Sequence, residues 1–212
     1  MRPRAADDRR GRAIFLDRDG TLVHSYHYPS RTEHLRVFDG IAPRLRFLRE
    51  SGFRLVVVTN QSAVARGYVD RATLDELHRH LRAELAARGV TLDAIYDCPH
   101  HPDGVVAELA VRCHCRKPEP GMILRAADEL RLDPARSWMV GDTSADAEAG
   151  RRAGCRTVLV AGEDAADDTV DGAHPTTTDR PAYTAPTTAQ ALDLIAHCER
   201  ARAFAGAPGA AR

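Results

Sequence analysis

Residues 14–21, Ile-Phe-Leu-Asp-Arg-Asp-Gly-Thr, are the stretch that decides the fold. An apolar run delivers Asp17 and Asp19 to a turn that Gly20 opens. In an extended strand, positions i and i+2 share a face, so both carboxylates can point at one reacting atom. One can act as a nucleophile while the other transfers a proton. Turn formation or calcium binding explains an isolated Asp-x-Asp-Gly equally well, so the rest of the chain must decide.

The composition is that of an ordinary globular domain. The chain has 212 residues, 43% of them hydrophobic and 28% charged, and its length suits one domain with a sizeable core. The formal net charge is zero, which gives no electrostatic basis for binding nucleic acid or a membrane. The first twelve residues lack the apolar core of a secretory signal, and no apolar run approaches the ~20 residues that span a bilayer. We expect a cytoplasmic monomer.

Strand and helix patterns alternate along the chain. Residues 53–58 are almost continuously apolar and β-branched, as in a strand covered on both faces. Helical stripes begin at Ile41 and at Leu74, the second with Asp70 as its N-cap. This alternation predicts an α/β fold, a Rossmann-like open and mostly parallel sheet with helices on both faces. The other expected strands are 13–16, 94–97, 138–140 and 157–160, and the other expected helices are 122–130, 145–153 and 189–200.

The domain organisation follows from the same pattern. We expect a flexible N-terminus over residues 1–11, one domain over 12–200 and a disordered tail over 201–212. Residues 161–188 are rich in Asp, Thr, Ala, Pro and Gly, which predicts a long loop with one short edge strand. The spacing between the strands leaves no room for a separate cap domain, so the site should be open apart from a flap near residues 26–31 and the loop 98–115.

Polar residues follow the predicted strands directly. Asp17, Thr59 and Asp142 each come at the carboxyl end of a strand, which is where parallel sheets bind ligands. With Lys117 they make the set that phosphoryl transfer needs, namely a nucleophile, a hydroxyl and an ammonium for the phosphate oxygens, and a carboxylate for Mg²⁺. Each residue alone has an ordinary explanation, as a helix cap, a surface lysine or a turn. Their joint occurrence in this order favours the catalytic interpretation.

The cysteines form a second pattern. Three of the five lie within Cys98-Pro-His100 and Cys113-His-Cys115. Three thiolates and one imidazole complete a tetrahedral Zn²⁺ site and leave no position for water, so the predicted zinc within loop 98–115 is structural. A chance cluster of buried cysteines is the alternative. His101 and His114 would exceed four ligands and are expected to lie outside the site.

The ordered motifs 17–21, 59–62, 116–118 and 141–146 resemble those of the haloacid dehalogenase-like phosphatases. The resemblance implies that Asp17 is the nucleophile and that Asp19 is the general acid and base. It also implies that Mg²⁺ is held by the Asp17 carboxylate, the Asp19 backbone carbonyl and Asp142, with Asp146 supporting the site. An acid at position 19 favours phosphatase over dehalogenase chemistry, because a halide leaves without a proton.

The zinc loop resembles that of one branch of this family, which removes the 7-phosphate of a heptose 1,7-bisphosphate. A branch acting on histidinol phosphate is the alternative, and so is a non-catalytic zinc-stapled binding protein on the same fold. Two positions depart from the heptose pattern, since Ala63 replaces a usual Gly and Thr143 a frequent Lys. The resemblance implies substrate contacts from Ser25, Tyr26, His27, Tyr28, Asn60, Gln61, Ser62, Arg116 and Thr143.

Overall fold

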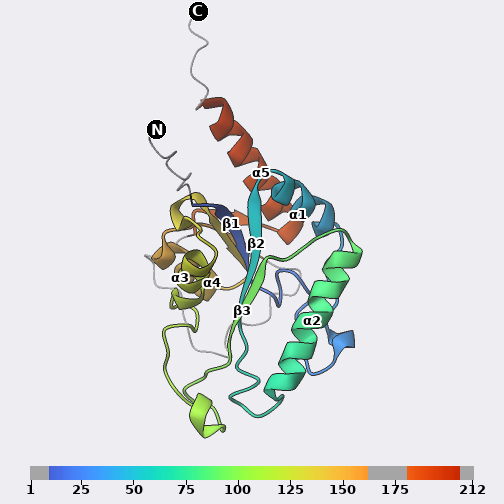
Figure 1. Cartoon of the computed structure of the whole chain (residues 1–212), viewed down its shortest axis with the longest axis vertical. Coiled ribbons are helices and arrows are strands. Elements are labelled where there is room, and N and C mark those ends of the chain that lie inside the picture. The colour runs from blue at the N-terminus through green and yellow to red at the C-terminus, as the bar shows by residue number, and fades with distance from the viewer. Residues whose placement is uncertain (1–9, 162–180, 206–212) are drawn as a thin grey trace, which may run out of the picture.

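A single parallel sheet organises the chain (Figure 1). The computed structural model describes residues 10–161 and 181–205. Its six strands lie in the order β3-β2-β1-β4-β5-β6, and every pair of neighbours is parallel. The expected sheet is therefore confirmed. Its strands are β1 (Arg12–Leu16), β2 (Phe53–Asn60), β3 (Ala94–Cys98), β4 (Trp138–Gly141), β5 (Arg156–Val160) and β6 (Tyr183–Ala185).

Helices cover both faces of the sheet, as the two separate cores show. Ile14 and Leu16 of β1 join one core with α1 (Ile41–Glu50), α2 (Arg71–Ala87) and α5 (Thr188–Ala205). Ala13 and Phe15 point the opposite way, into a core with α3 (Gly121–Glu129) and α4 (Ser144–Ala153). The two groups of helices lie on opposite sides of the sheet in Figure 1. Strand alternation thus gives a central strand that is buried on both faces.

Helices α2 and α4 have capping residues at their ends. The Asp70 carboxylate accepts a hydrogen bond from the backbone N–H of Thr73 and caps α2, as predicted. Thr143 and Asp146 form a reciprocal capping box at the start of α4. Gly154 closes α4 with a φ of 89°, a conformation that costs glycine little. Three short 3₁₀ turns complete the described elements: η1 (Thr32–His34), η2 (Ala107–Leu109) and η3 (Pro134–Arg136).

The chain ends differ in detail from the expectation. Gly11 already pairs with Leu132, and its N–H donates to the Arg131 carbonyl, so order begins before residue 12. The last helix continues to Ala205, because residues 201–205 contain no helix-breaking residue. The short edge strand expected within 161–188 is β6. The remaining expectations for residues 1–9, 162–180 and 206–212 lie outside the described residues.

The connections between strands are short. β1 and β2 are joined through η1 and α1, and β2 and β3 through α2, so the part of the chain that is described contains no cap domain over the carboxyl edge of the sheet. Two long, largely irregular connections interrupt this pattern: residues 17–40 after β1, which carry η1, and residues 99–120 after β3, which carry η2. None of the helices within the described ranges is both long and apolar enough to cross a membrane.

Candidate active site and metal cluster

The carboxyl ends of three adjacent strands bring the predicted residues together. Asp17 and Asp142 follow the neighbouring strands β1 and β4, and Thr59 lies at the end of β2 on the other side of β1. Gly20 turns the chain here with a φ of 77°. A Cβ at this position would collide with the Asp142 carboxylate, so the glycine allows the loop to pass close to that side chain.

Lys117 reaches this edge from the loop that follows the cysteine-rich segment. Its Nζ donates to Asp17 Oδ1 at 2.6 Å and to the Val58 carbonyl at 2.9 Å, and lies 2.5 Å from Asp146 Oδ1. The side chain is only 4% exposed, so these charges meet with little water between them. Asn60 fixes the loop, because its amide exchanges two hydrogen bonds with the Lys117 backbone.

Burial and neighbouring charges shift the pKa values of Asp17, Asp142 and Lys117. Burial, with the neighbouring Asp146 charge, raises the pKa of Asp17 to about 6 although Lys117 opposes the shift. Burial and the charge of Asp17 raise the pKa of Asp142 to about 8. Burial alone would lower the pKa of Lys117, but the charges of Asp146 and Asp17 outweigh it and raise the pKa above its usual range. The three carboxylates are therefore more than one ammonium can compensate.

A divalent cation fits this excess of negative charge. Asp17, Asp142 and Asp146 can each place a carboxylate oxygen within 4.8 Å of the others. Oxygen donors are the ligands that Mg²⁺ prefers, and the raised pKa values of Asp17 and Asp142 mark a place where positive charge is missing. The backbone carbonyl of Asp19, the other predicted ligand, follows in the same loop. The residues present are therefore a fitting donor set for magnesium.

Asp19 is held by a side-chain network on the α2 side of the site. Arg18 Nη2 donates to Asp19 Oδ2 at 2.8 Å and to Gln61 Oε1 at 2.9 Å. The Gln61 Nε2 donates to Asp19 Oδ2 at 3.0 Å and to Thr59 Oγ1 at 2.9 Å. Gln61 is buried, so its amide links the two predicted catalytic groups from within the wall of the site.

The other residues predicted to contact the substrate differ in burial and in their contacts. Tyr26 is 50% exposed and stacks on His34 with ring centroids 3.8 Å apart. Tyr28 adopts a φ of 53° and packs against Tyr68. Both belong to the segment that follows Gly20. Of their neighbours, Ser25 is half-buried and His27 is exposed. Ser62 and Arg116 are also half-buried. The hydroxyl of Thr143 donates a hydrogen bond to Asp146 Oδ2 at 2.7 Å.

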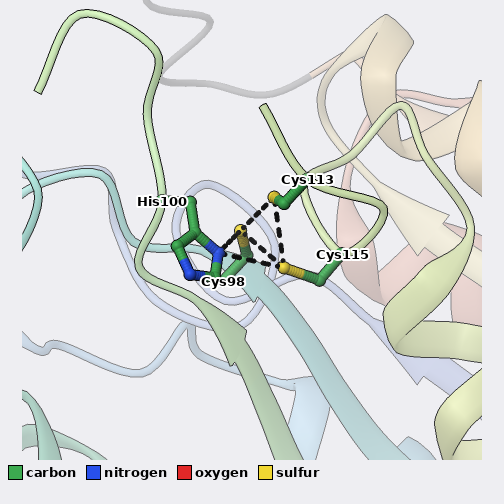
Figure 2. A group of neighbouring side chains, drawn as sticks. All are labelled: Cys98, His100, Cys113 and Cys115. Carbon is green, nitrogen blue, oxygen red and sulfur yellow. Dashed lines mark hydrogen bonds between the residues drawn. The ribbon is translucent and has the colours of Figure 1, made fainter. Parts of the chain in front are cut away.

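The second predicted site is a compact cluster of three sulfurs and one imidazole (Figure 2). The Cys115 Sγ lies 3.1 Å from that of Cys98 and 3.2 Å from that of Cys113, and the His100 Nδ1 lies 3.3 Å from Cys115 Sγ. These separations are too long for disulfide bonds, and all five cysteines are free. A tetrahedron of zinc–sulfur bonds has edges of about 3.8 Å, so the four donor atoms can surround one zinc ion.

The cluster joins β3 to the loop that carries Lys117. Cys98 ends β3, while Cys113 and Cys115 come from the far end of the loop. His101 lies outside the cluster, with its Nδ1 accepting from the Asp103 N–H and its Nε2 3.1 Å from Arg66 Nη2. A metal here would tie the two ends of the loop together one residue before Arg116.

Two residues have more contacts at the centre of the site than the sequence predicts. Asp146 was expected only to support magnesium binding, yet it shares the Lys117 ammonium. Arg18 was not assigned any role, yet it pairs with Asp19 and is fully buried. Asp146 belongs to the motif 141–146, so its involvement has a sequence signal. Nothing local distinguishes Arg18 from a solvent-exposed arginine, because the residues that enclose it beside Asp19, Gln61 after β2 and His78 on α2, are distant in sequence.

Comparison with known proteins agrees with the fold and with this geometry. A parallel sheet with these motifs at its strand ends defines a haloacid dehalogenase-like hydrolase, and a family model described as HAD-hydrolase-like matches residues 114–191. The D-glycero-beta-D-manno-heptose-1,7-bisphosphate 7-phosphatase of Yersinia pestis is 47% identical over 148 residues, covering 70% of this chain and 79% of the relative. The enzyme of the same name from Escherichia coli K12 is also 47% identical, with 70% and 78% covered.

Solved structures give the same result. A HAD-like phosphatase of Mesorhizobium loti has a TM-score of 0.75 at 34% identity, covering 90% of this chain and 87% of that one. The D,D-heptose 1,7-bisphosphate phosphatase of B. bronchiseptica, complexed with magnesium and phosphate, has a TM-score of 0.72 at 30% identity, with 88% and 98% covered. The chain belongs to the haloacid dehalogenase-like phosphatases, in the family of the heptose-1,7-bisphosphate 7-phosphatases.

Proposed function

We propose that the protein is a Mg²⁺-dependent phosphatase that removes the 7-phosphate of D-glycero-D-manno-heptose 1,7-bisphosphate through an aspartyl-phosphate. The observation that carries the proposal is the buried group of Asp17, Lys117 and Asp142 at the carboxyl edge of the sheet. The relatives named above carry the substrate assignment.

The chemistry follows from the positions of the side chains. An oxygen of Asp17 attacks phosphorus, and the bond from phosphorus to the sugar oxygen breaks as Asp19 gives its proton to that oxygen. Asp19 then takes a proton from a water molecule, whose oxygen attacks the aspartyl-phosphate and releases inorganic phosphate and free Asp17. Lys117 and Thr59 hold the phosphoryl oxygens during both transfers.

Two metal ions complete the proposed enzyme. Asp17, Asp142 and the Asp19 carbonyl would hold Mg²⁺, which supplies charge neutralisation between the nucleophile and the phosphate. Asp146 supports this site through Lys117. Cys98, His100, Cys113 and Cys115 would hold a structural Zn²⁺, because four protein ligands leave no open position for catalysis.

Substrate recognition is proposed for the residues around the edge of the site. Arg116 suits the second, non-reacting phosphate, since its guanidinium can bind two phosphate oxygens at once. Ser25, Tyr26, His27, Tyr28 and Ser62 are proposed to contact the sugar. Asn60, Gln61 and Thr143, whose side chains are hydrogen-bonded within the protein, are proposed to contact it from the wall of the site.

A cytoplasmic, monomeric enzyme acting on a small soluble ester is the simplest form of this proposal. Five free cysteines, all of them within or beside the apolar cores or the Cys/His cluster, support a reducing compartment. The neutral formal charge supports a small-molecule substrate rather than a nucleic acid.

The proposal is tested by phosphate release from the heptose bisphosphate in the presence of Mg²⁺. The wild type should turn over, and Asp17→Asn should lose activity because a neutral amide is too weak a nucleophile to attack phosphorus. Histidinol phosphate serves as the competing substrate, and a higher kcat/KM for it would reassign the enzyme. Equal turnover by wild type and Asp17→Asn would end the proposed mechanism. Failure of wild type to hydrolyse even acetyl phosphate would revive the non-catalytic alternative.

A further inference from the structure

Arg18 is a fully buried charge inside the active-site wall. Its exposed fraction is 0%, whereas the Asp19 side chain beside it is 27% exposed. A guanidinium without water is costly unless hydrogen-bonded counter-groups compensate it. Arg18 therefore stays buried only because specific partners hold it, and these partners identify what it does.

The principal partner is the carboxylate of Asp19. Arg18 Nη2 lies 2.8 Å from Asp19 Oδ2, and Arg18 Nε lies 3.2 Å from Oδ1 and 3.1 Å from Oδ2. The planar guanidinium therefore meets both carboxylate oxygens and fixes the plane of the carboxylate as well as its position. A single-point donor such as an ammonium would leave that plane free to rotate.

Two neutral side chains hold the guanidinium itself. Gln61 Oε1 accepts from Arg18 Nη2 at 2.9 Å. His78 of α2 lies on the opposite side, with its Nε2 3.4 Å from Arg18 Nη1. Burial, with the neighbouring Arg18 charge, lowers the pKa of His78 to about 4, so the ring is neutral at pH 7 and can accept a hydrogen bond. Gln61 and His78 thus hold the Arg18 guanidinium in the orientation that binds the Asp19 carboxylate.

We propose that Arg18 is a positioning residue that orients the Asp19 carboxyl group for proton transfer to the leaving oxygen. The inference rests on the proposed function, in which Asp19 protonates the sugar oxygen as its bond to phosphorus breaks. A carboxyl group transfers a proton well only from a defined direction, and the Arg18 fork supplies that direction. The Gln61 amide, shared with Thr59, places the oriented group beside the phosphate-binding hydroxyl.

The dependence on the leaving group tests the proposal. A sugar alkoxide needs a proton in order to leave, whereas p-nitrophenolate does not. Arg18→Met and Arg18→Gln should therefore lower kcat/KM for the heptose bisphosphate on the order of 100-fold, and that for p-nitrophenyl phosphate by less than about 5-fold. Arg18→Lys, which keeps the charge but loses the fork, should fall between wild type and the neutral variants on the sugar phosphate.

A control separates orientation from general loss of stability. Arg156 is also a largely buried arginine, paired with Glu199 at 2.7 Å and stacked over Trp138 at the opposite edge of the sheet. Arg156→Met should lower thermal stability without changing the ratio of the two kcat/KM values.

Two outcomes decide the matter. Equal losses of kcat/KM for both substrates in folded Arg18 variants would overturn the proposal. If the neutral variants do not fold, the same comparison of the two substrates is made with Arg18→Lys. Wild type that hydrolyses p-nitrophenyl phosphate but no sugar phosphate would instead overturn the proposed substrate.

Discussion

The ammonium of Lys117 lies 2.6 Å from Asp17 Oδ1 and is shared with Asp146, at 2.5 Å from its Oδ1. One buried cation therefore serves two carboxylates, with the third, Asp142, close by. In the proposed mechanism Lys117 has two roles, since it would hold a phosphate oxygen only by redistributing its contacts with the two aspartates. It also keeps two buried carboxylates from repelling each other before any ligand binds.

Loss of that ammonium should affect both stability and turnover. We predict that Lys117→Met lowers the free energy of unfolding by about 3 kcal/mol, because it leaves two buried carboxylates without their partner. Activity should fall at least about 100-fold, as the phosphoryl oxygens lose a donor. Urea unfolding and phosphate release measure the two effects separately.

A double-mutant cycle provides the control for this prediction. Adding Asp146→Asn to Lys117→Met should recover part of the lost stability, since one of the uncompensated charges is removed. Arg44→Met, which breaks the exposed pair with Asp193, should change stability by less than about 1 kcal/mol. Strictly additive losses in the cycle would show that Lys117 and Asp146 do not interact as the structure indicates.

The metal cluster should control stability more directly than chemistry. We predict that Cys113→Ser loses bound zinc and lowers Tm by roughly 10 °C, because the loop ends separate when one ligand is removed. Activity should be lost as a consequence, since the same loop carries Lys117. Zinc per chain by atomic absorption and thermal unfolding are the measurements.

Cys198 is the matched control, because it is also a half-buried free cysteine but lies on α5 away from the cluster. Cys198→Ser should keep full zinc content and a Tm near that of wild type. A Cys113→Ser protein that binds no zinc yet has the Tm of wild type would contradict the prediction that the zinc stabilises the fold.

Much of the fold was accessible from the sequence because its signals are local. The apolar run of residues 53–58 and the carboxylates at positions 17 and 19 place two strands and one edge of the sheet without tertiary information. The Cys-x-His and Cys-x-Cys spacings likewise predict the four members of the metal cluster, which the structure brings together.

What the sequence did not show depends on distant partners. Arg18 lies between Asp17 and Asp19 in a polar stretch, and its burial depends on Gln61 and on His78 of α2, 43 and 60 residues away. The departure at Thr143 had suggested only a missing cation. In the structure its hydroxyl caps α4 and binds Asp146, a role that requires knowing where the helix begins.

The neutral, buried His78 should make stability depend on pH. Its pKa is about 4 in the folded protein, against an ordinary value of 6.5, so between these values the unfolded chain binds a proton that the folded protein does not. The free energy of unfolding should therefore fall as the pH drops from about 6.5 toward 4. A difference of more than two pKa units corresponds to roughly 3 kcal/mol.

Comparison with His78→Asn isolates this effect. Asp17 and Asp142 have raised pKa values and act in the opposite direction, but they do so in both proteins and cancel in the difference. The excess stability of wild type over His78→Asn should shrink as the pH falls from 7 to 4, as measured by urea unfolding at each pH. A difference that stays constant over this range would show that His78 titrates alike in folded and unfolded protein.

Thr143 offers the last test, because its hydroxyl has two separable tasks. It accepts from the Asp146 N–H at 3.3 Å as the cap of α4, and it donates to Asp146 Oδ2 at 2.7 Å, which fixes the carboxylate that shares Lys117. We predict that Thr143→Ala lowers the free energy of unfolding by about 1 kcal/mol and lowers kcat as Asp146 loses its orientation. Thr143→Ser keeps the hydroxyl and should retain both properties, as urea unfolding and steady-state kinetics would show. A Thr143→Ala enzyme with wild-type kcat but reduced stability would confine the hydroxyl to helix capping, and the orientation of Asp146 would then rest on Lys117 and the Thr143 backbone N–H.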